Sequence, residues 1–350
     1  MKGLRKVIPP FAPDQSGAAS VLYALGGIIV ILDAGGCAGN ICGFDEPRWQ
    51  TKKSAIFSAG LRDMDAILGR DELLIKKLKD TTEKVEGSFA ALIGTPVPAV
   101  IATDFHVLEK MAEKKTGLPV ISVNTDGMEL YDAGAEKAYL TLMRKFAQEK
   151  MPTVKGRIGV LGMTPLDFGN PEDEKVLRNK LKDRGWSEIW CYGNGNLDEI
   201  KNASTAERNL VVAPDGLKAA IYLEEKFGIP YECLDPLAED IVKDADAVGK
   251  RILVVHQQIR ANSIRNELLK KGAKEVTAAS WFMMKPELKM EGDIHLTEED
   301  QLKELLEKGQ YDLIIGDKTM WGVSKKNFEN QIELSHFAVS GRTDEAWKES

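Results

Sequence analysis

Residues 31–49 read ILDAGGCAGNICGFDEPRW, and this stretch decides how the rest of the chain is interpreted. An apolar run from Gly27 to Leu32 ends at Asp33, and a turn rich in glycine and cysteine follows. An apolar run bounded by glycines predicts a buried strand that ends in a loop. In open α/β sheets, ligands bind outside the carboxyl ends of strands, so the loop is placed where a ligand would lie.

Glycines and thiols alternate in this loop. Gly35, Gly36 and Gly39 would let the backbone come close to a bulky group and turn its N–H groups toward that group. Cys37 and Cys42 add two thiols to the same turn. The loop is therefore a candidate cofactor-binding site, with the glycines as backbone contacts and the cysteines as metal ligands.

The spacing of the two cysteines is C-x4-C, which occurs in plant-type iron–sulfur proteins. In those proteins more cysteines follow nearby, whereas the next one here is Cys191, so small apolar side chains in a tight turn remain the alternative reading of Cys37 and Cys42. A four-thiolate cluster would need two more ligands. A two-fold dimer with the loop on its axis would supply them, because such an interface duplicates every residue. Asp14 or Asp45 could also replace a thiol.

Length and composition restrict the class of protein. With 350 residues, of which 43% are hydrophobic, the chain can form two or three domains with separate cores. The net charge of -7 argues against nucleic acid as a partner. No apolar run reaches the roughly 18 residues that span a bilayer, and the basic start soon meets three prolines, so we expect a cytoplasmic protein without a membrane partner. Four cysteines do not make a disulfide framework.

Apolar and amphipathic segments alternate in a βα rhythm that repeats three times. We expect strands at 27–32, 89–94, 118–123, 158–162, 187–191, 210–212, 251–255 and 311–317, and helices at 18–25, 71–84, 104–115, 134–150, 172–184, 197–202 and 216–227. This rhythm predicts an α/β protein of three Rossmann-like, doubly wound parallel-sheet domains around a central cleft. The expected domains are residues 1–150, 151–247 and 248–350.

Two of the four histidines are placed where they could reach that cleft. His256 directly follows the strand expected at 251–255, and His336 is expected in a similar place near the C-terminus. Each is a candidate catalytic proton donor near neutral pH, and the alternative is a hydrogen-bonded histidine with no part in chemistry. The chain has no G-x-x-x-x-G-K-[ST] motif, so it is not expected to hydrolyse ATP through a P-loop.

Five further segments occur in a fixed order around the cysteine loop. They are PPFAPDQSGA at 9–18, FSAGLRDMDAILG at 57–69, LIGTP at 92–96, PVISVNTDGM at 119–128 and LEEKFGIPY at 223–231. This order, over most of the chain, resembles the nitrogenase component 1 family. The resemblance implies the family fold and an iron–sulfur oxidoreductase.

The chain departs from the family pattern at cysteine positions, and these departures limit the functions that the resemblance implies. Cys37 falls on the family's loop cysteine, which holds a cluster near the subunit interface, and Cys42 is an extra thiol that could replace a lost ligand. The family's earlier cysteine is Ala12 or a neighbour here, and its later one is Pro96. Ala213 stands where nitrogenase proper has the cysteine that binds its catalytic metal cluster. The resemblance therefore implies a nitrogenase-like reductase, a group that includes dark protochlorophyllide reductase, and not dinitrogen reduction.

In such systems a separate ATP-hydrolysing iron protein delivers low-potential electrons. The expectation is thus a homodimer, or a pair with a pseudo-symmetric sister subunit, in which Cys37 and Cys42 of both copies hold one [4Fe–4S] cluster. The cluster would pass electrons to a substrate in the interdomain cleft. Two alternatives stay open: a scaffold or carrier of a metal cluster or cofactor without turnover, and a ligand-binding module with inert cysteines.

Overall fold

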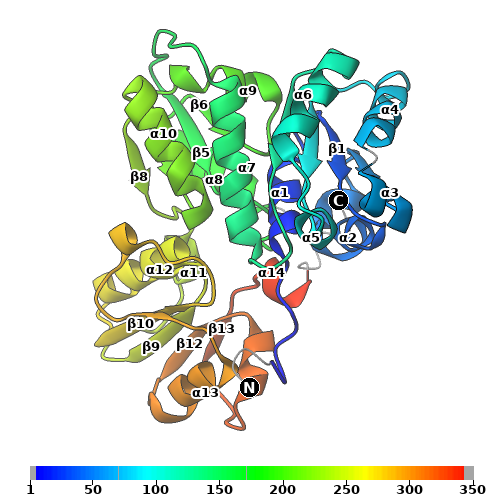
Figure 1. Cartoon of the computed structure of the whole chain (residues 1–350). Coiled ribbons are helices and arrows are strands. Elements are labelled where there is room, and N and C mark those ends of the chain that lie inside the picture. The colour runs from blue at the N-terminus through cyan, green and yellow to red at the C-terminus, as the bar shows by residue number, and fades with distance from the viewer. Residues whose placement is uncertain (1–4, 70, 171, 343–350) are drawn as a thin grey trace.

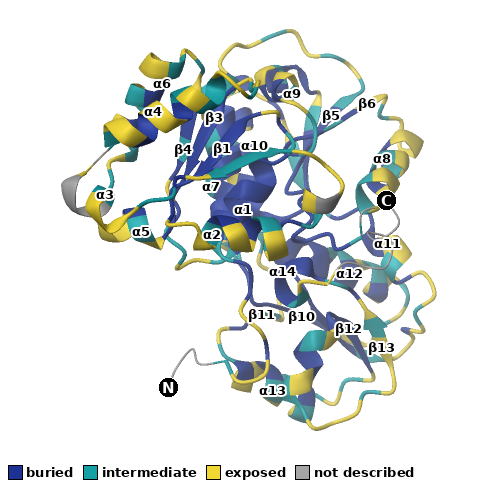
Figure 2. Ribbon diagram, turned by 90° about the vertical axis from the view of Figure 1, so that its right-hand side faces the viewer, coloured by how far each residue is buried: buried dark blue, intermediate teal, exposed yellow. Residues whose placement is uncertain are grey.

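Three separate parallel sheets form the protein, as the computed structural model shows (Figure 1). The structure describes residues 5–342 apart from Arg70 and Pro171. The first sheet has the order β2-β1-β3-β4, with β1 at Ile28–Ile31, β2 at Ala55–Ser58, β3 at Ala90–Ile93 and β4 at Val120–Val123. All residues of β1 and β3 are buried, because helices cover both faces of the sheet (Figure 2).

The other two sheets repeat this plan. The second has the order β6-β5-β7-β8, with β5 at Arg157–Leu161, β6 at Glu188–Cys191, β7 at Arg208–Val211 and β8 at Tyr231–Cys233. The third has the order β11-β10-β9-β12-β13, with β9 at Arg251–Val255, β10 at Glu275–Ser280, β11 at Asp293–His295, β12 at Leu313–Gly316 and β13 at Gln331–Glu333. The predicted fold of three doubly wound parallel sheets is confirmed. The boundaries at 150/151 and 247/248 stay a prediction.

Helices and short turns connect the strands. The helices are α1 (Asp14–Leu22), α2 (Gly36–Asn40), α3 (Asp63–Leu68), α4 (Asp71–Thr82), α5 (Pro96–Val100), α6 (Phe105–Thr116), α7 (Tyr131–Phe146), α8 (Asp173–Asp183), α9 (Leu197–Lys201), α10 (Leu217–Phe227), α11 (Ala238–Ile241), α12 (Gln258–Lys270), α13 (Glu299–Lys308) and α14 (Phe337–Ser340). A π-helical turn, Ile41–Asp45, directly continues α2. Among the described residues, no helix combines the length and the apolar character needed to cross a bilayer.

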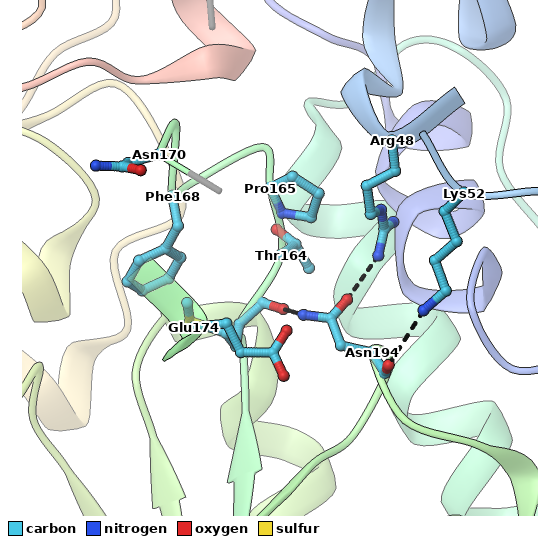
Figure 3. A pocket seen from close by; sticks show the side chains of 9 residues that line it. Arg48, Lys52, Thr164, Pro165, Phe168, Asn170, Glu174 and Asn194 are labelled. Carbon is cyan, nitrogen blue, oxygen red and sulfur yellow. Dashed lines mark hydrogen bonds between the residues drawn. The ribbon is translucent and has the colours of Figure 1, made fainter. Parts of the chain in front are cut away.

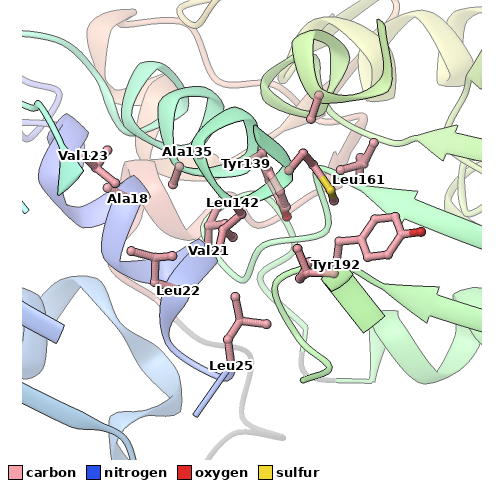
Figure 4. Packing of buried hydrophobic residues seen from close by; sticks show 14 of the residues in the cluster. Ala18, Val21, Leu22, Leu25, Val123, Ala135, Tyr139, Leu142, Leu161 and Tyr192 are labelled. Atoms are coloured by element: carbon pink, nitrogen blue, oxygen red, sulfur yellow. The ribbon is translucent and has the colours of Figure 1, made fainter. Parts of the chain in front are cut away.

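Helices α1 and α7 cross in direct backbone contact at two glycines. A Cβ atom added to Gly17 would lie 1.8 Å from the carbonyl oxygen of Tyr131, and one added to Gly134 would lie 1.8 Å from that of Asp14. Around the crossing, apolar side chains of both helices merge with side chains of the second sheet into one core (Figure 4). Helix α7 thus joins the first two sheets.

Residues 6–11 lie on the third sheet's side of the molecule. The backbone N–H groups of residues 6–8 donate to the carboxylate of Glu299 at 2.7–2.9 Å. Phe11 packs against Trp281 and Phe282, with ring centroids 5.8 and 5.2 Å apart. This N-terminal segment is expected to belong to the first domain, and its contacts also connect the first domain to the third sheet.

The glycine crossing generates a stability prediction. Gly134→Ala should lower the free energy of unfolding by at least about 3 kcal/mol, because the added methyl group meets backbone that has no room to move. Gly43→Ala is the matched control, since a Cβ there meets nothing within 4 Å and should change stability by less than about 0.5 kcal/mol. Urea titration followed by circular dichroism measures both. Equal effects of the two substitutions would contradict the packing argument.

Candidate functional site

The candidate residues gather at the carboxyl ends of the strands in the middle of each sheet. In every sheet the chain leaves its first strand (β1, β5 or β9) for one neighbour and later returns to the other side, which creates a switch point beside that strand. The cysteine loop follows β1 at the first switch point. The loops after β5, β7 and β9 meet near the start of α7, and we call this region the three-sheet junction.

Asp33 fixes the entry of the cysteine loop. One of its carboxylate oxygens accepts a hydrogen bond from the backbone N–H of Ala38 at 2.8 Å, and the other accepts one from the Ser58 hydroxyl at 2.6 Å. Between them, Gly35 takes a φ of 119°, which favours glycine. The turn is therefore built by β1 and β2, and it presents α2 at the edge of the sheet.

Both loop cysteines are half-buried free thiols. Cys37 lies in α2 and Cys42 in the π-helical turn that follows. Burial raises the pKa of Cys37, the charge of Asp33 adds to this rise, and the Thr95 side chain opposes it. Burial, together with the charge of Glu46, raises the pKa of Cys42. Both thiols are thus protonated at neutral pH, and a metal would have to displace their protons.

The outer side of the loop is open. Apart from neighbouring backbone, a Cβ atom added to Gly35, Gly36, Gly39 or Gly43 would meet no atom of the described residues within 4 Å. These glycines are therefore not required by packing within the chain, in contrast to those of the α1–α7 crossing. They leave room for a group that is not part of the same chain.

One chain offers two thiols to such a group. Among the described residues, neither Cys37 nor Cys42 belongs to a set of three or more potential ligands with donor atoms within 4.8 Å of one another. The carboxylate of Asp14 accepts hydrogen bonds from three backbone N–H groups, at 2.8, 3.0 and 2.8 Å, and that of Asp45 accepts one from Ser16 at 2.7 Å. Two thiols are half the number that a four-thiolate cluster needs, so a second chain would have to supply the rest.

Three large exposed apolar side chains lie on the same edge of the first sheet as the loop, and we call them the apolar rim. Phe44 is 74% exposed, Val100 85% and Met128 84%. They come from the turns after β1, β3 and β4, all at the carboxyl edge of the first sheet, where α2 and α5 lie (Figures 1 and 2). Clusters of this kind mark protein–protein contact surfaces.

At the three-sheet junction, three side chains from different parts of the chain form a hydrogen-bonded row. Tyr131, the first residue of α7, donates from Oη to Oδ1 of Asp167 at 2.5 Å. The same Oη lies 3.0 Å from Nε2 of His336, which follows β13. Asp167 lies in the loop after β5. All three are buried, so the row connects segments that belong to three different sheets.

His256 stacks on His336 in this row. The ring centroids are 4.1 Å apart and the rings are parallel to within 7°. Burial lowers the pKa of His256 well below its usual value, and the neighbouring His336 and Arg260 add to the effect. Donor atoms of Asp167, His256 and His336 lie within 4.8 Å of one another. Imidazole lone pairs lie in the ring plane, however, so parallel rings cannot both point at one ion, and the group is hydrogen-bonded rather than arranged as a metal site.

Buried carboxyl groups complete the junction. Asp132 accepts a hydrogen bond from the backbone N–H of Met283 at 2.5 Å, and burial raises its pKa to about 6. Burial also raises the pKa of Asp215 well above its usual value, and Asp167 and Asp132 add to this rise. The surroundings of Asp215 therefore favour its protonated, neutral form.

The junction does not fit a sulfur-ligated catalytic metal cluster. Ala213 is buried, and a Cβ on Gly162 would lie 2.7–2.9 Å from its atoms, so backbone packs closely there. Aromatic rings fill the space beside the histidines: Phe282 lies 4.6 Å from His336 and 5.0 Å from Tyr131, between ring centroids. The structure thus agrees with the sequence argument drawn from Ala213.

Comparison with known proteins places the chain in a family. Residues 16–239, more than half of the chain, match the model of the nitrogenase component 1 type oxidoreductases. The chain belongs to this family. Its fold resembles the solved structure "Nitrogenase Cp1 at pH 6.5", with a TM-score of 0.76 over 99% of this chain and 90% of that one, at 12% sequence identity.

Curated family members match over part of their length. The nitrogenase iron-molybdenum cofactor biosynthesis protein NifE of Clostridium pasteurianum is 28% identical over 201 residues, which cover 55% of this chain and 43% of the relative. One subunit of the light-independent protochlorophyllide reductase of Gloeothece citriformis (strain PCC 7424) is 32% identical over 132 residues, 37% of this chain and 25% of the relative. The matched region is thus less than half the length of either relative.

Sequence reasoning named some of the junction residues and missed others. His256 and His336 were named as candidates and lie together. Tyr131, Asp167 and Asp215 were not, although Asp167 and Asp215 follow β5 and β7 as His256 follows β9. His256 was singled out because it directly follows its strand, so the rule would find the two aspartates only if it were extended to the whole loop after each strand.

The raised pKa of Asp132 makes stability depend on pH. Its pKa rises from 3.8 in the unfolded chain to about 6 in the fold, so the folded state loses stability as the pH rises from about 4 to 6. Asp132→Asn should remove this loss, and the variant should gain up to about 3 kcal/mol on the wild type between pH 4 and pH 7. Unfolding by urea at both pH values measures this. A difference between the two proteins that does not change with pH would contradict it.

Proposed function

We propose that the protein is a nitrogenase-like iron–sulfur oxidoreductase subunit that acts as a homodimer, with one [4Fe–4S] cluster held by Cys37 and Cys42 of both copies. The observation that carries the proposal is the open cysteine loop: two half-buried thiols, a row of glycines that side-chain packing does not require, and an apolar rim. Family membership supports iron–sulfur binding in this region.

When bound, the cluster would supply one-electron transfer at the dimer axis, with electrons delivered by a separate ATP-hydrolysing iron protein. The residues of the chain would bind and position it. Asp33 holds the start of α2, Gly35, Gly36 and Gly39 allow backbone to approach, and the two thiols become ligands once deprotonated. A substrate would then be reduced near the interdomain cleft.

His336 and His256 are proposed as the proton source for that reduction. Nε2 of His336, Oη of Tyr131 and Oδ1 of Asp167 form a continuous hydrogen-bonded row, along which a proton can move without any large displacement. The ring of His256 stacks on the buried ring of His336. Tyr131 and Asp167 would carry the proton along this row, and their hydrogen bonds also hold His336 in place.

A second candidate is a scaffold or carrier for a metal cluster or cofactor. The similarity to NifE, named as a cofactor biosynthesis protein, and a junction that does not fit a catalytic cluster both favour it. Incubation with a family iron protein and ATP separates the two, since a carrier should reduce no substrate.

Iron binding should depend on both loop thiols. After anaerobic reconstitution with iron and sulfide, the wild type should hold about four iron atoms per two chains, and Cys37→Ser and Cys42→Ser should each lose most of this iron. Cys233→Ser is the control, because Cys233 is also partly accessible but lies in β8. Iron analysis and the visible spectrum provide the readout. Full iron content in Cys37→Ser would defeat the assignment.

Dimer formation should depend on the apolar rim. Phe44→Asp and Val100→Asp should weaken self-association at least tenfold, because each places a carboxylate in a contact surface. Val248→Asp is the matched control, since Val248 is 74% exposed far from the loop in sequence and lies before β9. Sedimentation equilibrium measures the association. A monomeric wild type, or equal effects at the three positions, would speak against the dimer.

A further inference from the structure

A pocket of about 180 Å³ lies between the segment after the cysteine loop and the carboxyl end of the second sheet (Figure 3). Arg48 and Lys52 form one wall. Thr164, in the loop after β5, and Asn194, after β6, face them, and Phe168 lies at the far side. The pocket is separate from the loop thiols and from the hydrogen-bonded row at the junction.

Two of the charged groups at the pocket already have partners. Nε and one terminal nitrogen of Arg48 contact the carboxylate of Glu46 at 2.7 Å each, and the other terminal nitrogen donates to Oδ1 of Asn194 at 2.6 Å. Glu174, which also lines the pocket, pairs with Arg178 at 2.7 Å. Each of these pairs combines one positive and one negative charge. The net positive charge of the pocket therefore comes from Lys52.

Lys52 has no carboxylate of its own. Its Nζ donates to the backbone oxygen of Asn194 at 3.5 Å, and among the described residues no carboxylate lies within 4.0 Å of it. Burial lowers the pKa of Lys52 and the charge of Arg48 adds to this effect, whereas the charges of Glu174 and Glu46 oppose it. An anion in the pocket would stabilise the charged form of Lys52.

A buried hydroxyl also lacks a partner here. Thr164 is only 2% exposed, and its Oγ1 makes no hydrogen bond to any residue that the structure describes. A buried polar group left unpaired costs about 1–3 kcal/mol, so a ligand oxygen that accepts from it would recover that cost. Asn194 is already held in place, since its amide donates to the backbone oxygen of Met163 at 3.0 Å.

The rest of the lining is apolar. Met163, Pro165 and Phe168 contribute it, and Arg260 holds the Phe168 ring from behind, with its guanidinium carbon 4.4 Å from the ring centroid. The volume is similar to that of the ~150 Å³ cavities that accept one benzene-sized molecule. A single positive charge beside an apolar lining fits a small monoanion with a hydrocarbon part better than a phosphate.

We propose that this pocket binds a small carboxylate, with the carboxylate on Lys52 and the Thr164 hydroxyl and the hydrocarbon part on Met163, Pro165 and Phe168. The site does not depend on the cluster, so it can be tested on protein without iron.

Ligand-observed NMR with butyrate, butyramide and inorganic phosphate tests the proposal at constant ionic strength. Butyrate should bind to the wild type at least tenfold more tightly than the neutral butyramide or phosphate. Lys52→Met should weaken butyrate binding at least tenfold, and Thr164→Val, which keeps the side-chain shape, about threefold. Lys53→Met is the matched control, because Lys53 lines a different pocket, and it should bind butyrate as the wild type does.

Three results would overturn the proposal. Equal binding of butyrate and butyramide would show that the charge plays no part. Tighter binding of phosphate would reject the carboxylate class. Equal loss in Lys52→Met and Lys53→Met would place the anion on the general surface charge and not in the pocket. Thermal melting of each variant identifies a loss of fold as the cause of lost binding, and Thr164→Val then provides the test if Lys52→Met is unstable.

Discussion

The backbone contact between α1 and α7 is the constraint on which the other features depend. Two glycines let the helices approach until main-chain atoms touch, and side chains of any size would force them apart. This contact sets where α7 begins. Tyr131 and Asp132, at that point, reach into the three-sheet junction, and the start of α1 lies beside the turn that carries Met128. The crossing therefore positions the residues that α7 contributes to the junction.

The junction shows how the fold carries many ionisable groups in its interior. Isolated buried charges are costly, so such groups are either neutral or paired. Asp215 and Asp132 have raised pKa values, His256 a lowered one, and Arg260 pairs with Asp235 at 2.8 Å. The ionisable groups of the junction are therefore kept neutral or paired, which limits what their burial costs the fold.

Apolar runs were a reliable guide to the central strands and a partial guide to the edge strands. β1, β3, β5, β7, β9 and β12 are mostly buried apolar runs, and the sequence indicated each of them, together with the edge strands β4 and β6. β2, β8, β11 and β13 were missed because they are three- or four-residue edge strands that are partly exposed. β10 was missed for another reason: its interior residues, Thr277 to Ser280, are small, and its burial comes from its neighbours. The cysteine loop could be located from the sequence, whereas the row of Tyr131, Asp167 and His336 depends on tertiary packing that no local pattern encodes.

The count of thiols in the loop has a consequence for the behaviour of the purified protein. If two chains share one cluster, neither chain alone can retain it, and iron content becomes a matter of mass action. Dilution, or any partner that competes for the apolar rim, would then release the cluster, and the protein would lose its colour without any oxidant. Colour would report on assembly as much as on redox state.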